Sequence, residues 1–272
     1  MTLIVSFKKC YARHLGSCSG RSREHVISRA ILESLAPFGV QGFPWLELGE
    51  TGKASPNSLT AAVLCEHHNG LLSGYDAEAA KLFAHLKLID SKATPEELNT
   101  VPPISIDGVR FEKWLLKVLC GIQASGNFMV DGKFFGKLPP SEYMVDLLYR
   151  DGPWKPGIGL YIDFGQLNRM NAFRGLGYDP VYVMTTPTNA MICGIDIRLW
   201  GFPFRGLFAP YEDGSILPGF RPPKLEVVNG VVRKEIRFAW PAGTPPNTWP
   251  ILTRDGTIPD AVAAPPGTPQ DA

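Results

Sequence analysis

Residues 10–28 read CYARHLGSCSGRSREHVIS and residues 64–69 read LCEHHN, and these two stretches decide the fold of the N-terminal part of the chain. In the second stretch, two residues separate Cys65 from His68. This C-x-x-H spacing lets a thiolate and an imidazole point at one ion, so the stretch predicts one half of a metal site.

Cys10 and Cys18, separated by seven residues, supply the other half. Four soft ligands form the closed tetrahedral site of a structural zinc ion. A unit of about 80 residues with a long Gly/Pro-containing loop has little core of its own, so a metal cross-link would supply much of its stability. His14 is a rival of Cys18, and His67 is a rival of His68. We predict that Zn²⁺ is bound by Cys10, Cys18, Cys65 and His68.

The segment between the ligand pairs holds Glu24 and His25 followed by an apolar Val-Ile pair, and Asn69 comes directly after the last ligand. A cysteine pair, an acidic residue with a histidine, a loop and a Leu-Cys-x-x-Cys-Asn knuckle, in this order, make up the motif of the HNH (ββα-metal) endonucleases. The N-terminal third of this chain, residues 8–90, resembles that family.

The resemblance implies a metal knuckle that pins a β-hairpin against a helix, and it implies a role for three residues. His25 would be the general base that takes a proton from water, which suits an imidazole titrating near neutrality. Glu24 and Asn69 would hold a catalytic Mg²⁺ or Mn²⁺ ion, for which carboxylate and amide oxygens are suitable hard ligands. Such an ion stabilises the leaving oxygen of a phosphodiester while the activated water attacks in line.

Departures from the family pattern are visible in the sequence. The first cysteine pair has a longer spacing than is common in the family, so its loop is longer. Glu24 stands where many members have aspartate, and its longer side chain would reach an ion through water or only orient its neighbours. His68 stands in place of a cysteine, a substitution that zinc tolerates.

The region around the motif is basic. Residues 8–34 hold six lysines and arginines against two glutamates, a local net charge of +4, in a chain whose overall net charge is +1. A basic patch beside a general base attracts and positions a phosphodiester backbone. We therefore predict DNA as the partner, contacted by Lys8, Lys9, Arg21, Arg23 and Arg29.

The amino-acid composition limits the fold classes and the functions that the chain can have. The chain has 272 residues, of which 44% are hydrophobic and 19% charged, so it is globular rather than disordered and has one or two domains. It contains 28 glycines and 25 prolines, an excess that favours turns and short strands over a helical bundle. No phosphate loop or dinucleotide fingerprint is present, so the sequence offers no nucleotide-binding motif.

Targeting signals and cysteine usage indicate the compartment. No apolar run is long enough for a transmembrane helix. The first ten residues, MTLIVSFKKC, place their apolar run before the lysines, which is the reverse of a secretory signal. Five cysteines are an odd number, which disfavours a disulfide framework. We expect a cytoplasmic protein without a membrane partner.

Downstream of the motif, apolar residues recur with helical spacing. Residues 74–88 predict a helix with Asp76 as its N-cap. Residues 108–123 and 141–150 predict two further helices, the first with one buried face. Cys120, in the helix predicted over residues 108–123, is expected to be a core residue.

From residue 158 onward, short β-branched and aromatic runs predict strands. The clearest is KLEVVNGVVRKEIRF, residues 224–238, in which Asn229 and Gly230 predict the turn of a hairpin. The turn-forming residues in 42–60 predict a loop. The Pro- and Gly-rich residues 241–272 predict a loose tail.

These patterns predict an α+β protein in three parts. A zinc-stapled HNH nuclease domain spans residues 1–92, a helical and then antiparallel-β region spans residues 101–240, and the tail spans residues 241–272. The expected function is metal-dependent DNA endonuclease, with a role in bacterial restriction or anti-phage defence suggested by analogy alone. The β-rich region is a candidate for recognising nucleic acid, binding a regulatory protein or sensing a ligand. The alternative is a non-catalytic zinc module that binds nucleic acid or a protein.

Overall fold

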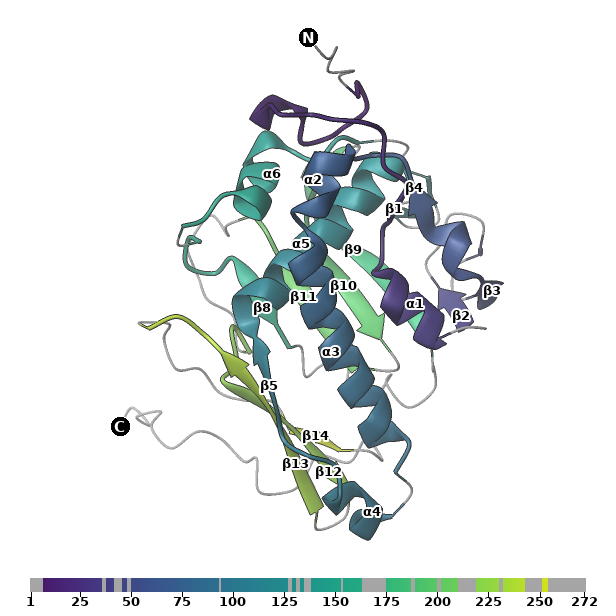
Figure 1. Ribbon diagram of the computed structural model, residues 1–272, viewed down its shortest axis with the longest axis vertical. Helices are drawn as coiled ribbons and strands as arrows, with labels where there is room; N and C mark the ends of the chain where they lie inside the picture. The colour runs from purple at the N-terminus through teal and green to yellow at the C-terminus, as the bar shows by residue number, and fades with distance from the viewer. Residues whose placement is uncertain are drawn as a thin grey trace.

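The computed structural model of this chain describes most of its length. The described residues are 7–35, 38–41, 46–47, 50–92, 94–126, 129–130, 133–134, 138–152, 154–162, 175–186, 189–199, 202–209, 219–229, 232–242 and 251–253. The fold is mixed α+β (Figure 1). None of the described helices is long and apolar enough to cross a membrane.

The elements alternate along the chain. The helices are η1 (Arg13–Leu15), α1 (Arg29–Leu35), η2 (Pro56–Leu59), α2 (Glu66–Gly70), α3 (Ser73–Asp90), α4 (Pro95–Asn99), α5 (Gly108–Ser125) and α6 (Glu142–Tyr149). The strands are β1 (Glu24–His25), β2 (Phe38–Gln41), β3 (Gly52–Ala54), β4 (Thr60–Ala61), β5 (Ile104–Asp107), β6 (Met129–Val130), β7 (Lys133–Phe134), β8 (Gly159–Tyr161), β9 (Gly175–Thr186), β10 (Asn189–Leu199), β11 (Phe202–Leu207), β12 (Lys224–Asn229), β13 (Val232–Ala239) and β14 (Ile251–Thr253).

Two larger sheets carry most of the strands. Among the described residues, one sheet has six strands in the order β3-β2-β9-β10-β11-β8, and another has four in the order β14-β12-β13-β5. Most neighbours are antiparallel, as predicted, but β2 runs parallel to β9, β5 to β13 and β14 to β12. The sheets are therefore mixed, because segments far apart in the sequence add to their edges.

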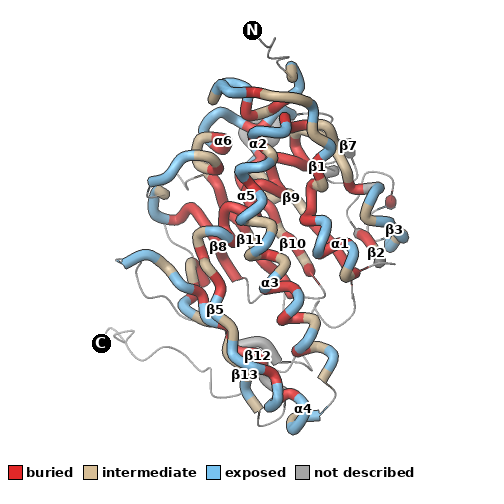
Figure 2. The backbone as a smooth tube through the Cα atoms, in the orientation of Figure 1, coloured by how far each residue is buried: buried red, intermediate tan, exposed pale blue. Residues whose placement is uncertain are grey.

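Helix α5 lies at the centre of the core. It packs against α3, α6 and strands of both larger sheets, and buried segments gather around it in Figure 2. Phe111 stacks on Trp114 and meets Phe204 of β11 edge-on, with ring centroids 5.1 Å apart in the second pair. Asp107 caps the start of α5 by accepting a hydrogen bond from a backbone N–H. Gly126 ends it with a φ of 82°, a left-handed conformation that glycine adopts without strain.

The three helices predicted downstream of the motif are present as α3, α5 and α6. The prediction that Asp76 caps α3 is wrong, because the N-cap is Leu72 and no side chain caps the helix. Asp76 lies inside the first turn and is engaged by an ion pair described below. The hairpin of β12 and β13 is also present, but Asn229 belongs to β12 and pairs with Val232, so it is not a turn residue.

The N-terminal third shares its core with the rest of the chain. Strands β2 and β3, from residues 38–54, extend the sheet built by β8 to β11, and one hydrophobic cluster includes residues of both parts. This packing crosses the domain boundary expected near residue 92. The segment expected to be a loop, residues 42–60, contains β3 and η2, and the predicted tail contains β14; residues 243–250 and 254–272 of that tail lie outside the described residues.

Candidate metal centre and active site

Four buried side chains converge near the N-terminus. The Sγ atoms of Cys10, Cys18 and Cys65 lie 3.5, 3.7 and 3.1 Å from Nδ1 of His68, and all four atoms lie within 4.8 Å of one another. With Zn–S bonds of about 2.3 Å and a Zn–N bond of about 2.0 Å, the S–N edge of a tetrahedron is ~3.5 Å. The three distances bracket that value, so this Cys3His cluster could hold a metal ion such as zinc.

Backbone hydrogen bonds bring the two ligand pairs together. The N–H of Tyr11 donates to the carbonyl oxygen of Val63 over 3.0 Å. The N–H of Ser22 donates to the carbonyl oxygen of Leu64 over 3.2 Å. The chain between the first two cysteines turns at Gly16, whose φ is 81°. The seven residues between Cys10 and Cys18 therefore form a loop, and backbone hydrogen bonds join the chain on either side of this loop to the residues just before Cys65.

Cys65 is also the N-cap of α2, and its Sγ accepts a hydrogen bond from the N–H of His68. Burial opposes ionisation, but hydrogen bonds from the backbone of His68 and Ser19 and from the other two thiols hold the pKa of Cys65 below its usual value. Burial raises the pKa of Cys10 to about 12 and also raises the pKa of Cys18. A bound cation would favour the thiolate form of all three ligands.

The rival ligands lie outside the cluster. Nε2 of His14 lies 3.3 Å from Oδ1 of Asp146 on α6, at the surface. His67 is exposed, and its backbone N–H donates to Oγ of Ser19. The cluster brings together Cys18 and His68, the two ligands preferred from the sequence, and neither of these two histidines.

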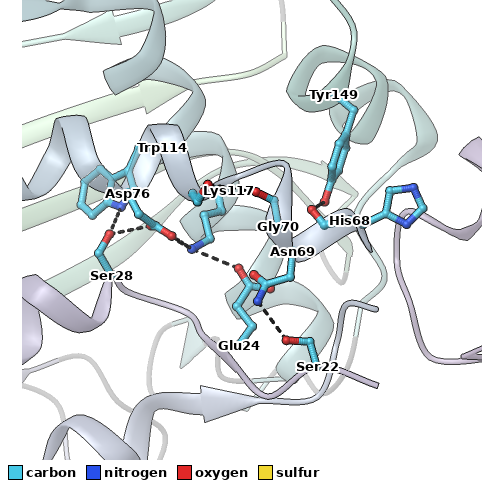
Figure 3. A network of polar contacts seen from close by, with 11 residues as sticks. Ser22, Glu24, Ser28, His68, Asn69, Gly70, Asp76, Trp114, Lys117 and Tyr149 are labelled. Carbon is cyan, nitrogen blue, oxygen red and sulfur yellow. Dashed lines mark hydrogen bonds and ion pairs between the residues drawn. The ribbon is translucent and has the colours of Figure 1, made fainter. Parts of the chain in front are cut away.

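Tyr149 of α6 supports the cluster from outside, and sequence analysis did not identify it. Its hydroxyl donates to the carbonyl oxygen of His68 over 3.1 Å (Figure 3). Its ring also meets the imidazole of His68 edge-on, with centroids 5.3 Å apart. Helix α6 is thereby fixed against α2.

Strands β1 and β4 form an antiparallel pair, and α2 follows β4, although α1, β2, β3 and η2 lie between the two strands along the chain. Glu24 is paired with Ala61 and His25 with Thr60. Successive residues of a strand project to opposite faces. Accordingly, Glu24 is buried in the core, whereas His25 is only half-buried.

The imidazole of His25 has a ring nitrogen without a partner. Its Nε2 is enclosed and makes no hydrogen bond within the described part of the chain. Such enclosed, unsatisfied polar atoms are rare in folded proteins and call for an explanation. Burial lowers the pKa of His25, and the positive charges of Arg29 and Lys117 lower it further, which favours the neutral form of the ring.

A hollow of about 510 Å³ lies along β4. Thr60 lines it, and residues directly opposite in an antiparallel pair project to the same face. Ala61, the partner of Glu24, lines the hollow as well, so the lining does not distinguish the face of His25 from that of Glu24, and neither residue is among the described residues that line it. Lys9 adds a positive charge to the lining.

The other residues predicted to contact a phosphodiester lie nearby in the sequence and at the surface. Lys8, Arg21 and Arg23 are exposed. Arg29 is exposed as well, but its Nε lies 2.7 Å from Oε1 of Glu33. The amide nitrogen of Asn69 donates to Oγ of Ser22 over 2.9 Å, which leaves the amide oxygen for another donor or a cation.

Glu24 has a partner that sequence analysis did not identify. Oε1 of Glu24 lies 3.1 Å from Nζ of Lys117 on α5, and the same ammonium lies 2.7 Å from Oδ2 of Asp76 on α3 (Figure 3). Burial raises the pKa of Glu24 against the opposing attraction of Lys117. The available signal was a lysine three residues after Trp114, within the apolar pattern of the helix.

No family model, curated protein or solved structure matches this chain. Within the described residues, the Cys3His cluster is the one group of three or more His, Cys, Asp or Glu side chains able to share an ion. The roles of Glu24, His25 and Asn69 stay predictions.

Proposed function

We propose that this chain is a DNA endonuclease of the HNH type, in which His25 is the general base. The observation that carries the proposal is the position of His25. The Cys3His cluster fixes the knuckle to which β1 is attached, and β1 carries a half-buried imidazole whose Nε2 is enclosed and has no partner within the described residues. A neutral imidazole held in this way is suited to taking a proton from a water that attacks a phosphodiester.

The surrounding residues would bind and orient the substrate. Lys8, Lys9, Arg21 and Arg23 are exposed cations around the motif, and such cations neutralise backbone phosphates. Asn69 would use its free amide oxygen to orient the attacking water. Zinc would hold this arrangement together without taking part in the reaction.

The family resemblance adds a catalytic Mg²⁺ or Mn²⁺ held by Glu24 and Asn69, and the residues fit such an ion only in part. Asn69 leaves an oxygen available. Glu24 is buried, is in contact with Lys117, and leaves the strand on the face opposite His25. We therefore assign the proton transfer to His25 and no ion to Glu24.

Plasmid cleavage tests the proposal. Zinc-loaded protein would be incubated with supercoiled plasmid, with and without Mg²⁺ or Mn²⁺, beside His25→Ala and His67→Ala. We expect cleavage by the parent and by His67→Ala, whose histidine is exposed and outside the cluster, and none by His25→Ala. Equal, weak cleavage by all three proteins would indicate a contaminating nuclease and reject the proposal.

The second candidate is a zinc module that binds DNA or a protein without cutting. The ion pair of Glu24 with Lys117 favours it, because the acidic residue of the motif is occupied. Retained DNA binding by a parent protein that does not cleave would support this function. In either case, a role in bacterial defence and a regulatory partner for the C-terminal strands are proposals by analogy.

A further inference from the structure

The buried cation between β1, α3 and α5 is the strongest feature that the proposed function leaves unused. Nζ of Lys117 lies 2.8 and 2.7 Å from the two carboxylate oxygens of Asp76 and 3.1 Å from Oε1 of Glu24. Lys117 and Glu24 are each 2% exposed, and Asp76 is 29% exposed. One ammonium thus joins two carboxylates from different elements inside the core (Figure 3).

Further hydrogen bonds fix this arrangement. Oγ of Ser28 donates to Oδ1 of Asp76 over 2.6 Å, and the indole Nε1 of Trp114 donates to the same hydroxyl over 2.8 Å. An ammonium has three donors, and Lys117 directs them at three carboxylate oxygens. Moving Lys117 away would bury an unpaired charge, which is costly. The ammonium is therefore a resident part of the site.

Glu24 cannot bind a divalent ion while the ammonium of Lys117 is in contact with its carboxylate. Mg²⁺ binds carboxylate oxygens at about 2.0–2.1 Å and requires near-octahedral coordination. An ion on Oε1 of Glu24 would lie against the positive charge of Lys117, which is already in contact with that oxygen. Oε2 of Glu24 is enclosed and has no partner within the described residues.

We propose that the ammonium of Lys117, which Asp76 also holds, occupies at Glu24 the place that the HNH motif gives to a divalent metal ion between Glu24 and Asn69. This inference rests on the proposed function for the identity of the site. Lys117 is a positioning residue, because its ammonium holds β1 and thus His25 in place without touching substrate. Lys117 balances one of the two negative charges of Glu24 and Asp76. Besides Lys117 and Asp76, the charged side chains that act on His25 are Arg29 and Glu33.

Binding of Mn²⁺ alone, followed by electron paramagnetic resonance in zinc-loaded protein, tests the proposal. Four proteins would be compared, namely the parent, Glu24→Gln, Lys117→Ala and the double variant. We expect the parent and Glu24→Gln to bind Mn²⁺ equally weakly. Lys117→Ala, with space and two uncompensated carboxylates, should gain about one Mn²⁺ per chain, and at least about tenfold tighter than the parent. The double variant should lose this gain.

Two results would overturn the proposal. One is a Mn²⁺ site in the parent that Glu24→Gln removes, and the other is a folded Lys117→Ala that gains no site. If Lys117→Ala does not fold, labelling of amines in the parent decides instead. Lys117 should stay unlabelled in the presence and absence of Mn²⁺, and labelling that rises with Mn²⁺ would show that the ion displaces it. None of these measurements needs DNA cleavage, so a parent that fails to cut plasmid rejects the proposed function alone.

Discussion

Nζ of Lys117 lies 3.1 Å from Oε1 of Glu24, in a part of the core where each side chain is 2% exposed. The pair ties the two-residue strand β1 to the central helix α5. Removing one partner of a buried pair leaves the other charge without compensation, which costs far more than losing a surface pair. The position of His25, the next residue in β1, therefore depends on Lys117.

Replacing Lys117 with methionine is expected to lower the free energy of unfolding by about 3–5 kcal/mol. The change keeps the volume of the side chain and leaves the buried carboxylate of Glu24 and the partly exposed carboxylate of Asp76 without the ammonium. Lys113→Met on the same helix is the control, because the hydrogen-bond partners of its ammonium are a backbone carbonyl oxygen, that of Arg150, and a carboxylate exposed to solvent, that of Asp151. We expect the control to lose about 1 kcal/mol. Urea unfolding of both variants measures the difference, and equal losses would contradict the role given to the buried triad.

Replacing His68 with alanine is expected to remove about one zinc ion per chain. Its Nδ1 faces three thiols, whereas the neighbouring His67 is exposed and outside the cluster. His67→Ala should therefore keep the zinc content of the parent. Elemental analysis of the purified proteins makes the comparison. A well-folded parent that contains no zinc would defeat the assignment of this cluster.

The metal ligands could be predicted from sequence because their signal is local. Cys65 and His68 share one turn of chain, and Cys10 and Cys18 are soft ligands in the same N-terminal third. The pairing of Lys117 with Glu24 could not be predicted, because it depends on how α5 packs across β1. A lysine in an apolar helix pattern is a visible anomaly, but the pattern does not identify its partner.

The elements of the fold, too, could be predicted where their signal is local and not where they depend on pairing between distant segments. Helix α5 and the hairpin of β12 and β13 have strong local periodicity and were predicted with the right type and near the right bounds. The pairing of β2 with β9 and of β14 with β12 joins distant segments, for which periodicity gives no signal. Asp76 resembled an N-cap because it opens an apolar pattern, whereas its partners Ser28 and Lys117 come from other elements.

If the chain binds DNA through its basic motif region, Arg23→Ala should weaken binding and reduce the slope of log Kd against log salt concentration by about one. Arg23 is exposed next to β1. Arg237→Ala is the charge-matched control, because Arg237 is exposed on β13 and pairs with Glu235. Fluorescence anisotropy over a salt series measures both slopes. Identical slopes for the two variants would show that binding depends on net charge rather than on this region.

Glu112 is expected to make stability depend on pH. It is fully buried on α5, where Arg221 contacts both of its carboxylate oxygens over 2.9 and 3.0 Å and the N–H of Leu160 donates to it over 2.7 Å. Burial outweighs these contacts and raises the pKa of Glu112 from about 4.5 to about 7. The folded protein therefore keeps a proton that the unfolded chain releases. The contribution of Glu112 is complete below about pH 4.5 and is lost as the pH rises through about 7.

Urea unfolding across this range measures the effect. The free energy of unfolding should fall as the pH rises from about 4.5 to about 7, and Glu112→Gln, which cannot titrate, should flatten that fall. Glu235→Gln is the control. Hydrogen bonds from Arg237 and Lys224 lower the pKa of Glu235, so its contribution is present above its usual pKa and is lost only on acidification. The control should keep the slope of the parent, and a Glu112→Gln variant with the same slope would show that the carboxyl is ionised in the core throughout.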